Sequence, residues 1–170
     1  MESFDFRSPS KICSIAERNL RPGEEFYSIL VEQENGDVIR REIAAENWTA
    51  APENCFAWWK TTMPSNESGK VYWAPRAVML AFFDHVRQQP GQADTAYLTA
   101  LLLAQKKILA TKESWDTEDS SKLVLENRKE KIVYEIPVVD VSPQRQSEIQ
   151  KELAEKLFSD FPPDQDQGEV

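Results

Sequence analysis

The chain has 170 residues, 41% of them apolar, which is enough for a hydrophobic core in one domain or two small subdomains. Its 20 Lys and Arg against 29 Asp and Glu give a net charge of −9, and a surface of that sign repels phosphate backbones, so nucleic acid is a disfavoured partner. No apolar stretch approaches the length of a membrane span, and the first residues lack a basic segment followed by an apolar one. We therefore expect a cytoplasmic protein that does not enter the membrane.

The two cysteines, Cys13 and Cys55, are too few for a disulfide framework. In a reducing compartment each is expected to serve as a small buried apolar residue. A single Cys13–Cys55 bridge is the alternative.

The first regular elements are two strands joined by a tight turn. Residues 26–34 alternate in the manner of a strand, Asn35-Gly36-Asp37 tolerates positive φ, and residues 38–43 resume an extended pattern. This sequence predicts a β-hairpin. Residues 48–73 hold four of the five tryptophans and are expected to form an irregular, aromatic-rich connection.

A pair of helices is predicted in the centre of the chain. Pro75 suits the first turn of a helix whose apolar residues recur at helical spacing as far as the stop signal Gln89-Pro90-Gly91. A second helix begins near Asp94 and is apolar on almost every side, so we expect it in the interior. No Gly or Pro marks its end, which leaves open a strand within residues 108–115.

The last third of the chain changes to a period of two. Residues 122–126 and 131–139 flank a charged turn and predict a second hairpin or a three-stranded meander, with Pro137 indicating an edge strand. Ser142 then supplies an N-cap for a final amphipathic helix that begins at Pro143.

These patterns together predict an α+β fold with an N-terminal ribbon-like hairpin, a central helical pair, a second hairpin or meander, and a C-terminal helix. The expected boundaries are an N-terminal extension over 1–12, a single domain over 13–160 and a disordered acidic tail over 161–170.

The run Cys-Ser-x-x-x-Arg-x-Leu-x-Pro-Gly-Glu-x-Phe-Tyr-Ser at residues 13–28, followed by Arg40-Arg41 and Trp48, resembles the opening of a family of uncharacterised bacterial proteins. Segments 97–109, 134–140 and 148–158 extend the resemblance over nearly the whole chain. The resemblance supports the one-domain layout and implies no catalytic residues.

Residues 13–48 also resemble a degenerate zinc ribbon, in which a hairpin joins two C-x-x-C knuckles. Cys13 keeps the first ligand position, but Ala16 occupies the second, and Ala44 and Asn47 stand where the other knuckle belongs. One thiolate out of four cannot close a structural zinc site. We therefore expect a hairpin that folds without metal and a protein without a cofactor.

Catalytic chemistry has weak support in the sequence. His85 is the only histidine, and adjacent helical residues point about 100° apart, so Asp84 is badly placed to orient it as a base. No phosphate-binding, dinucleotide-binding or nucleophile motif is present. Two alternatives stay open: an irregular zinc site in which Cys55, His85 and an acidic residue join Cys13, and an enzyme whose carboxylates are assembled only by the fold.

The leading hypothesis is a non-enzymatic protein-interaction or accessory protein. Aromatic and arginine side chains dominate protein interfaces. The candidate partner-binding residues are Trp48, Trp58, Trp59, Trp73, Arg40 and Arg41. The alternatives are that the tryptophans form core and that the two arginines bind local acids such as Glu42. The oligomeric state is open.

Overall fold

The computed structural model describes residues 12–63, 72–112 and 122–159 and has an α+β fold. The chain forms two compact units, one from residues 1–81 with 151–170 and the other from residues 82–150. Helices α1 (Arg76–Gln88) and α3 (Pro143–Leu157) each contribute residues to both units.

The first unit is built on the predicted N-terminal hairpin, which the structure confirms. Strands β3 (Glu25–Glu32) and β4 (Val38–Ala44) pair antiparallel, with Tyr27 opposite Ile43. Gly36 takes a φ of +86° in the turn between them, a conformation that glycine adopts without a steric penalty.

The expected irregular connection is wrong for residues 55–62, which form strand β5 (Cys55–Thr62). Strand β5 pairs antiparallel with β3 and forms the edge of a five-stranded sheet with the order β2-β1-β4-β3-β5. Its buried residues, Ala57, Trp59 and Thr61, alternate as a strand requires. Aromatic residues occupy the other face as well, which conceals this alternation in the sequence.

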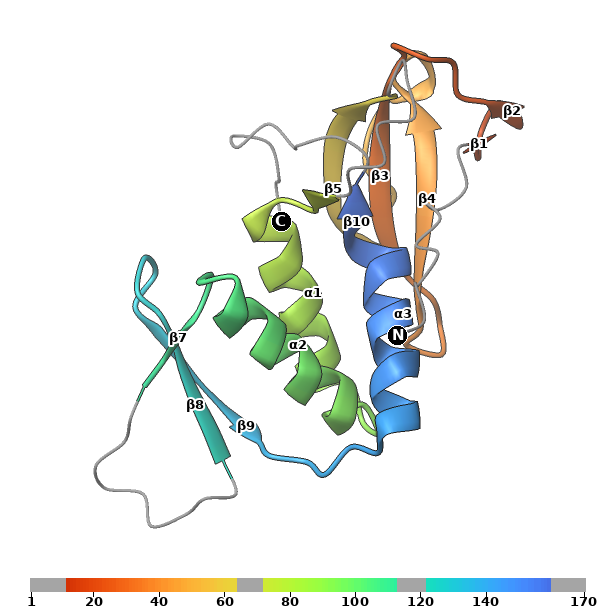
Figure 1. Ribbon diagram of the computed structural model, residues 1–170. Coiled ribbons are helices and arrows are strands. Elements are labelled where there is room, and N and C mark those ends of the chain that lie inside the picture. The colour runs from red at the N-terminus through yellow and green to blue at the C-terminus, as the bar shows by residue number, and fades with distance from the viewer. Residues whose placement is uncertain (1–11, 64–71, 113–121, 160–170) are drawn as a thin grey trace. The chain divides into compact units, whose positions relative to one another are not determined.

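A small knuckle lies beside β4 at the other edge of this sheet (Figure 1). Strands β1 (Ile12–Cys13) and β2 (Arg18–Asn19) pair antiparallel, and Cys13 of β1 lies opposite Glu42 in a parallel pairing with β4. A short 3-10 helix, η1 (Ala45–Asn47), follows β4 directly. Strands β6 (Tyr72–Trp73) and β10 (Phe158–Ser159) form a separate two-stranded sheet.

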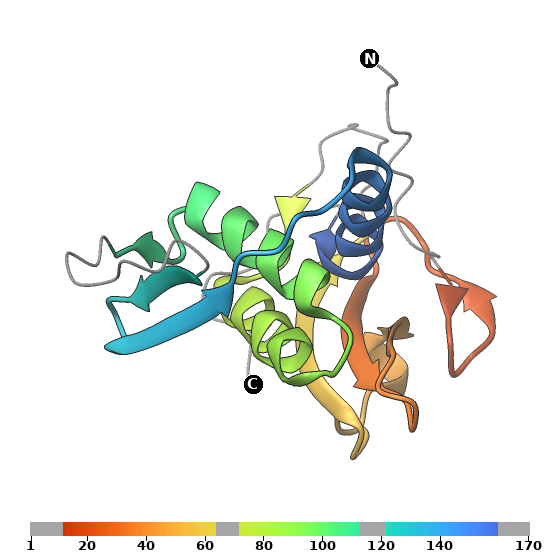
Figure 2. The ribbon, with the colours of Figure 1, turned by 90° about the horizontal axis from the view of Figure 1, so that it is seen from below.

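The second unit contains α2 (Ala93–Gln105) and a three-stranded antiparallel sheet in the order β7-β8-β9. Its strands are β7 (Ala110–Thr111), β8 (Lys122–Asn127) and β9 (Ile132–Pro137), so the predicted meander is confirmed. Helix α2 lies along this sheet (Figure 2).

The ends of two helices show which helix boundaries the sequence could predict and which it could not. Ser142 caps α3 as predicted, because its Oγ accepts the Arg145 N–H at 3.2 Å. Helix α2 ends without glycine: Lys107 takes the left-handed conformation, with a φ of +60°.

The expectations for the tail over 161–170 and for the extension up to residue 11 lie outside the described residues. None of the described helices is long and apolar enough to cross a membrane.

Candidate functional site

Three aromatic side chains meet on one face of the five-stranded sheet. Tyr27 of β3 stacks on Trp48, which follows η1, with ring centroids 4.2 Å apart. Trp58 of β5 lies edge-on to Tyr27 at 5.7 Å and tilted against Trp48 at 5.5 Å. All three side chains are half-buried. We call Tyr27, Trp48 and Trp58 the aromatic cluster.

The aromatic cluster is held in place by the core beneath it. Trp48 and Trp58 pack against a group of buried apolar residues in the first unit. The members of that group are Cys13, Leu20, Phe26, Ile29, Val31, Ile43, Ala44 and Met63. Because one side of the rings rests on this core, the half that stays exposed is presented on a rigid support.

Two cations lie on the same face of the sheet as the aromatic cluster. Arg41 of β4 lies opposite Ile29 of β3, which in turn lies opposite Trp58, so the three form one row across the strands. Arg41 is exposed and makes no hydrogen bond or ion pair within the part of the chain that the structure describes. Lys60 places its Nζ 5.8 Å from the centroid of Tyr27. Glu25 of β3 lies on this face too, with its Oε2 3.0 Å from Lys60 Nζ, so the charge of Lys60 is balanced locally and that of Arg41 is not.

Trp59 and Arg40 point to the opposite face of the same sheet and are buried there. Arg40 Nε donates to Glu42 Oε1 at 2.7 Å, and the Arg40 guanidinium lies 4.8 Å from the Trp59 ring centroid. Arg40 also donates to the carbonyl oxygen of Phe158, and Ser28 Oγ donates to Glu42 Oε2. Trp59 is fully buried. These two candidates hold the interior together and offer no surface to a partner.

Trp73 lies in the two-stranded sheet, where its ring packs edge-on against Phe158 at 4.4 Å. Of the predicted residues, the structure therefore brings together Trp48, Trp58 and Arg41. Tyr27 was missed, although the strand alternation places it on the same face as Ile29 and thus gives a signal for it.

The four positions compared with a zinc ribbon lie together around one sulfur atom. Cys13 Sγ accepts N–H groups from Ala16 at 3.4 Å, Ala44 at 3.3 Å and the Asn47 side chain at 3.6 Å. Burial opposes ionisation of this thiol, but the donors outweigh it and hold the pKa of Cys13 below its ordinary value. Cys13 and Cys55 are both free thiols, and the described residues contain no group of three or more metal-binding side chains.

His85 is half-buried on α1. The carboxylate of its neighbour Asp84 accepts a hydrogen bond from Arg87 Nε at 2.7 Å. Asp84 is thus hydrogen-bonded to Arg87, about one turn further along the helix, as the helical spacing predicts.

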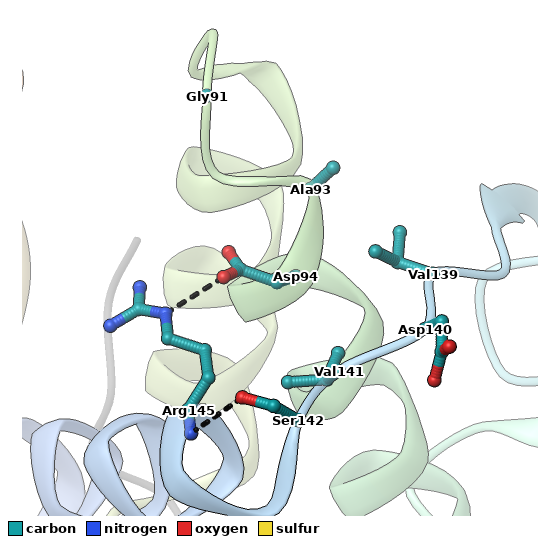
Figure 3. Close-up of a pocket in the computed structure, with 8 residues that line it drawn as sticks. All are labelled: Gly91, Ala93, Asp94, Val139, Asp140, Val141, Ser142 and Arg145. Carbon is teal, nitrogen blue, oxygen red and sulfur yellow. Dashed lines mark hydrogen bonds and ion pairs between the residues drawn. The ribbon is translucent and has the colours of Figure 1, made fainter.

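A recess of about 430 Å³ in the second unit lies beside the first turns of α2 and α3 (Figure 3). Within it, Arg145 Nε donates to Asp94 Oδ2 at 2.8 Å. Partial burial opposes ionisation of Asp94, but the Arg145 and Thr95 donors hold its pKa below the ordinary value. The Asp140 carboxylate points away from Asp94. The two carboxylates do not converge on one point, as a pair that shares proton transfer must.

Comparison with protein-family models, with curated proteins and with solved structures finds no match for this chain. The resemblances to a bacterial family and to a degenerate zinc ribbon therefore stay predictions.

Proposed function

We propose that this chain is a non-enzymatic interaction protein that binds a segment of a protein partner through the aromatic cluster. The observation that carries the proposal is the position of Tyr27, Trp48 and Trp58, half-buried on one sheet face beside the exposed Arg41. Trp, Tyr and Arg are the residue types that contribute most to the affinity of protein interfaces, and rigid rings lose little conformational entropy on binding.

The chemistry of the face indicates the chemistry of the partner. The exposed halves of the rings match large apolar side chains, whereas Arg41 and Lys60 match carboxylates. Lys60 already places its Nζ 3.0 Å from Glu25 Oε2, so Arg41 is the cation with the greater capacity to bind a new acid. The expected partner segment therefore combines aromatic or aliphatic residues with Asp or Glu.

An enzyme built on carboxylates has less support. A catalytic pair needs carboxylates that face one substrate atom, whereas Asp94 is bound to Arg145 and Asp140 points elsewhere (Figure 3). The net charge of −9 also disfavours a nucleic acid on the aromatic face.

Affinity purification from the native cell, followed by titration of the purified partner, tests the proposal. The bait variants are Arg41→Glu and Trp48→Ala, and Arg128→Glu, an exposed arginine in the turn after β8, is the matched control. We expect the wild type and Arg128→Glu to retain the same partner and the two cluster variants to bind it at least about tenfold more weakly.

Two results would overturn the proposal. One is a partner that binds both cluster variants as tightly as the wild type. The other is a catalytic turnover by the purified chain that is lost on His85→Ala. Thermal melting of each variant shows whether weaker binding reflects the surface or a loss of folding.

A further inference from the structure

The face that carries the aromatic cluster lies close to the point where the chain enters the sheet. Strand β1 runs parallel to β4 with Cys13 opposite Glu42, so Ile12 lies beside Arg41. Ile12 is 47% exposed, and apolar surface therefore continues from Arg41 onto β1. Residues 1–11 are thus attached next to the cation whose charge is not balanced locally.

The sequence of residues 1–11 matches the ligand chemistry expected for that face. Phe4 and Phe6 flank Asp5, and residues 2–6 contain two acids and no cation. Phenylalanine rings pack favourably on tryptophan and tyrosine rings, and a carboxylate pairs with an exposed guanidinium such as that of Arg41. The two cations of the segment come later, nearer to the sheet.

The segment is long enough to reach the aromatic cluster. Phe6 precedes Ile12 by six residues, and an extended chain spans about 3.3 Å per residue, so Phe6 can lie up to about 20 Å away. Neighbouring strands are about 4.8 Å apart, and the order β1-β4-β3-β5 therefore puts about 15 Å between β1 and β5. Every residue of the cluster on β3 and β5 is within this reach.

Attachment to the same chain makes even weak binding effective. A tethered segment is present at a local concentration on the order of 1 mM, so an intrinsic dissociation constant below that value keeps the face mostly occupied. A partner then has to displace the segment, which raises the apparent dissociation constant of the partner.

We propose that the N-terminal segment regulates the aromatic cluster by binding to it, with Phe4 and Phe6 against the exposed rings and Asp5 paired with Arg41. The segment occupies the face until a partner of similar chemistry displaces it. The regulatory role rests on the proposed function, whereas the contact itself can be tested on the purified chain alone.

Nuclear magnetic resonance of the full chain tests the contact, because each tryptophan indole N–H gives its own signal. Trp48→Phe and Trp58→Phe assign the two signals of the aromatic cluster. We expect Phe4→Ala/Phe6→Ala to shift both signals and to leave the signal of Trp59, which is buried on the opposite face, in place.

A charge exchange tests the pairing of Asp5 with Arg41. Arg41→Glu should release the segment, and Arg41→Glu/Asp5→Arg, which restores opposite charges, should return the signals toward those of the wild type. A synthetic peptide of residues 1–11, added to Phe4→Ala/Phe6→Ala, should also restore them, with half-saturation at about 1 mM or below.

Phe161→Ala, near the other end of the chain, is the control and should shift neither signal. Signals unaffected by Phe4→Ala/Phe6→Ala would overturn the proposal. Signals that respond to Phe161→Ala instead would assign the face to the C-terminal segment, and signals that change on dilution would assign it to a second copy; both results would also overturn the proposal. Thermal melting shows that each variant is folded.

The partner recovered by affinity purification separates this inference from the proposed function. Phe4→Ala/Phe6→Ala should bind that partner at least about threefold more tightly than the wild type does. Equal affinity of this variant, together with weaker binding by Arg41→Glu, would overturn the regulation and leave the proposed function standing. A partner that binds Arg41→Glu and Trp48→Ala as tightly as the wild type would overturn the proposed function, whatever the tryptophan signals show.

Discussion

Tyr27 and Trp48 stack nearly parallel, with 12° between their ring planes, and so join the segment after η1 to the middle of the sheet. The same two rings are half-exposed. One pair of side chains thus contributes both to stability and to the proposed binding surface, and variants of it have to be assessed for both.

Replacing Trp48 should therefore destabilise the first unit. We expect Trp48→Ala to lower the free energy of unfolding by about 2 kcal/mol, because it removes the stack on Tyr27 and packing against the core. Trp48→Phe keeps an aromatic ring and should cost about half as much. Urea denaturation followed by near-UV circular dichroism measures both values, with Thr49→Ala, at an exposed neighbour, as control. Equal stability of Trp48→Ala and the wild type would show that the stack contributes nothing.

Breaking the ion pair between Arg40 and Glu42 should lower the free energy of unfolding by more than the loss of Trp48 does. Both side chains are nearly inaccessible, at 6% and 4% exposure, so removing one charge leaves the other buried without its partner. We expect Glu42→Ala to cost about 3 kcal/mol. The double variant Arg40→Met/Glu42→Leu removes both charges and should recover most of this loss. If the double variant is less stable than Glu42→Ala in urea denaturation, the pair stabilises the fold beyond neutralising its own charges.

Much of the fold could be predicted from local chemistry. The turn at Gly36 and the cap at Ser142 are each determined by residues close in sequence, and both elements form where the pattern places them. Strand β5 could not be recognised locally, because aromatic residues lie on both of its faces, with Trp58 and Trp59 pointing in opposite directions.

The candidate site depends on pairing between distant segments. Trp58 joins Tyr27 only through the register of β5 against β3, which shifts at a bulge between Leu30 and Val31. A shift of one residue would exchange Trp58 with Trp59 between the faces. The sequence therefore singled out the tryptophans as candidate partner-binding residues but could not tell which of them is exposed.

The pH dependence of stability should report the contact between Arg18 and Glu24. Hydrogen bonds from Arg18, at 2.9 and 2.5 Å, hold the pKa of Glu24 at about 2. Because this folded-state pKa lies below the value of about 4.3 in an unfolded chain, the unfolded state binds the proton more tightly. The stabilisation is therefore complete above about pH 5 and is lost as the pH falls through about 4 toward 2.

Melting temperatures of the wild type and Glu24→Gln test this prediction. We expect the variant to melt lower at neutral pH and the difference to shrink as the solution is acidified. Glu34→Gln, at an exposed carboxyl in the β3–β4 turn, is the control and should follow the wild type throughout. A Glu24→Gln deficit that stays constant down to pH 2 would assign the effect to packing rather than to the charge.

The Cys13 knuckle should fold without metal. Its sulfur is fully buried and accepts three N–H groups, so hydrogen bonds occupy the space around it. In a working zinc ribbon the binding energy, on the order of 10 kcal/mol, is coupled to folding, and removal of the metal unfolds the region. Here we expect a strong chelator to leave the melting temperature and the amide dispersion of the hairpin unchanged.

Substitution of Cys13 separates a packing role from a metal-binding one. Cys13→Ser keeps an acceptor for the N–H groups of Ala16 and Ala44 and should cost about 1 to 2 kcal/mol, as a modest packing variant does. Cys13→Ala leaves those donors buried without an acceptor and should cost more than Cys13→Ser. Urea denaturation in metal-free buffer measures both. Stoichiometric zinc in the purified chain, with a drop in melting temperature after chelation that Cys13→Ser abolishes, would instead show that Cys13 is a ligand and that the donors around it are not its main partners.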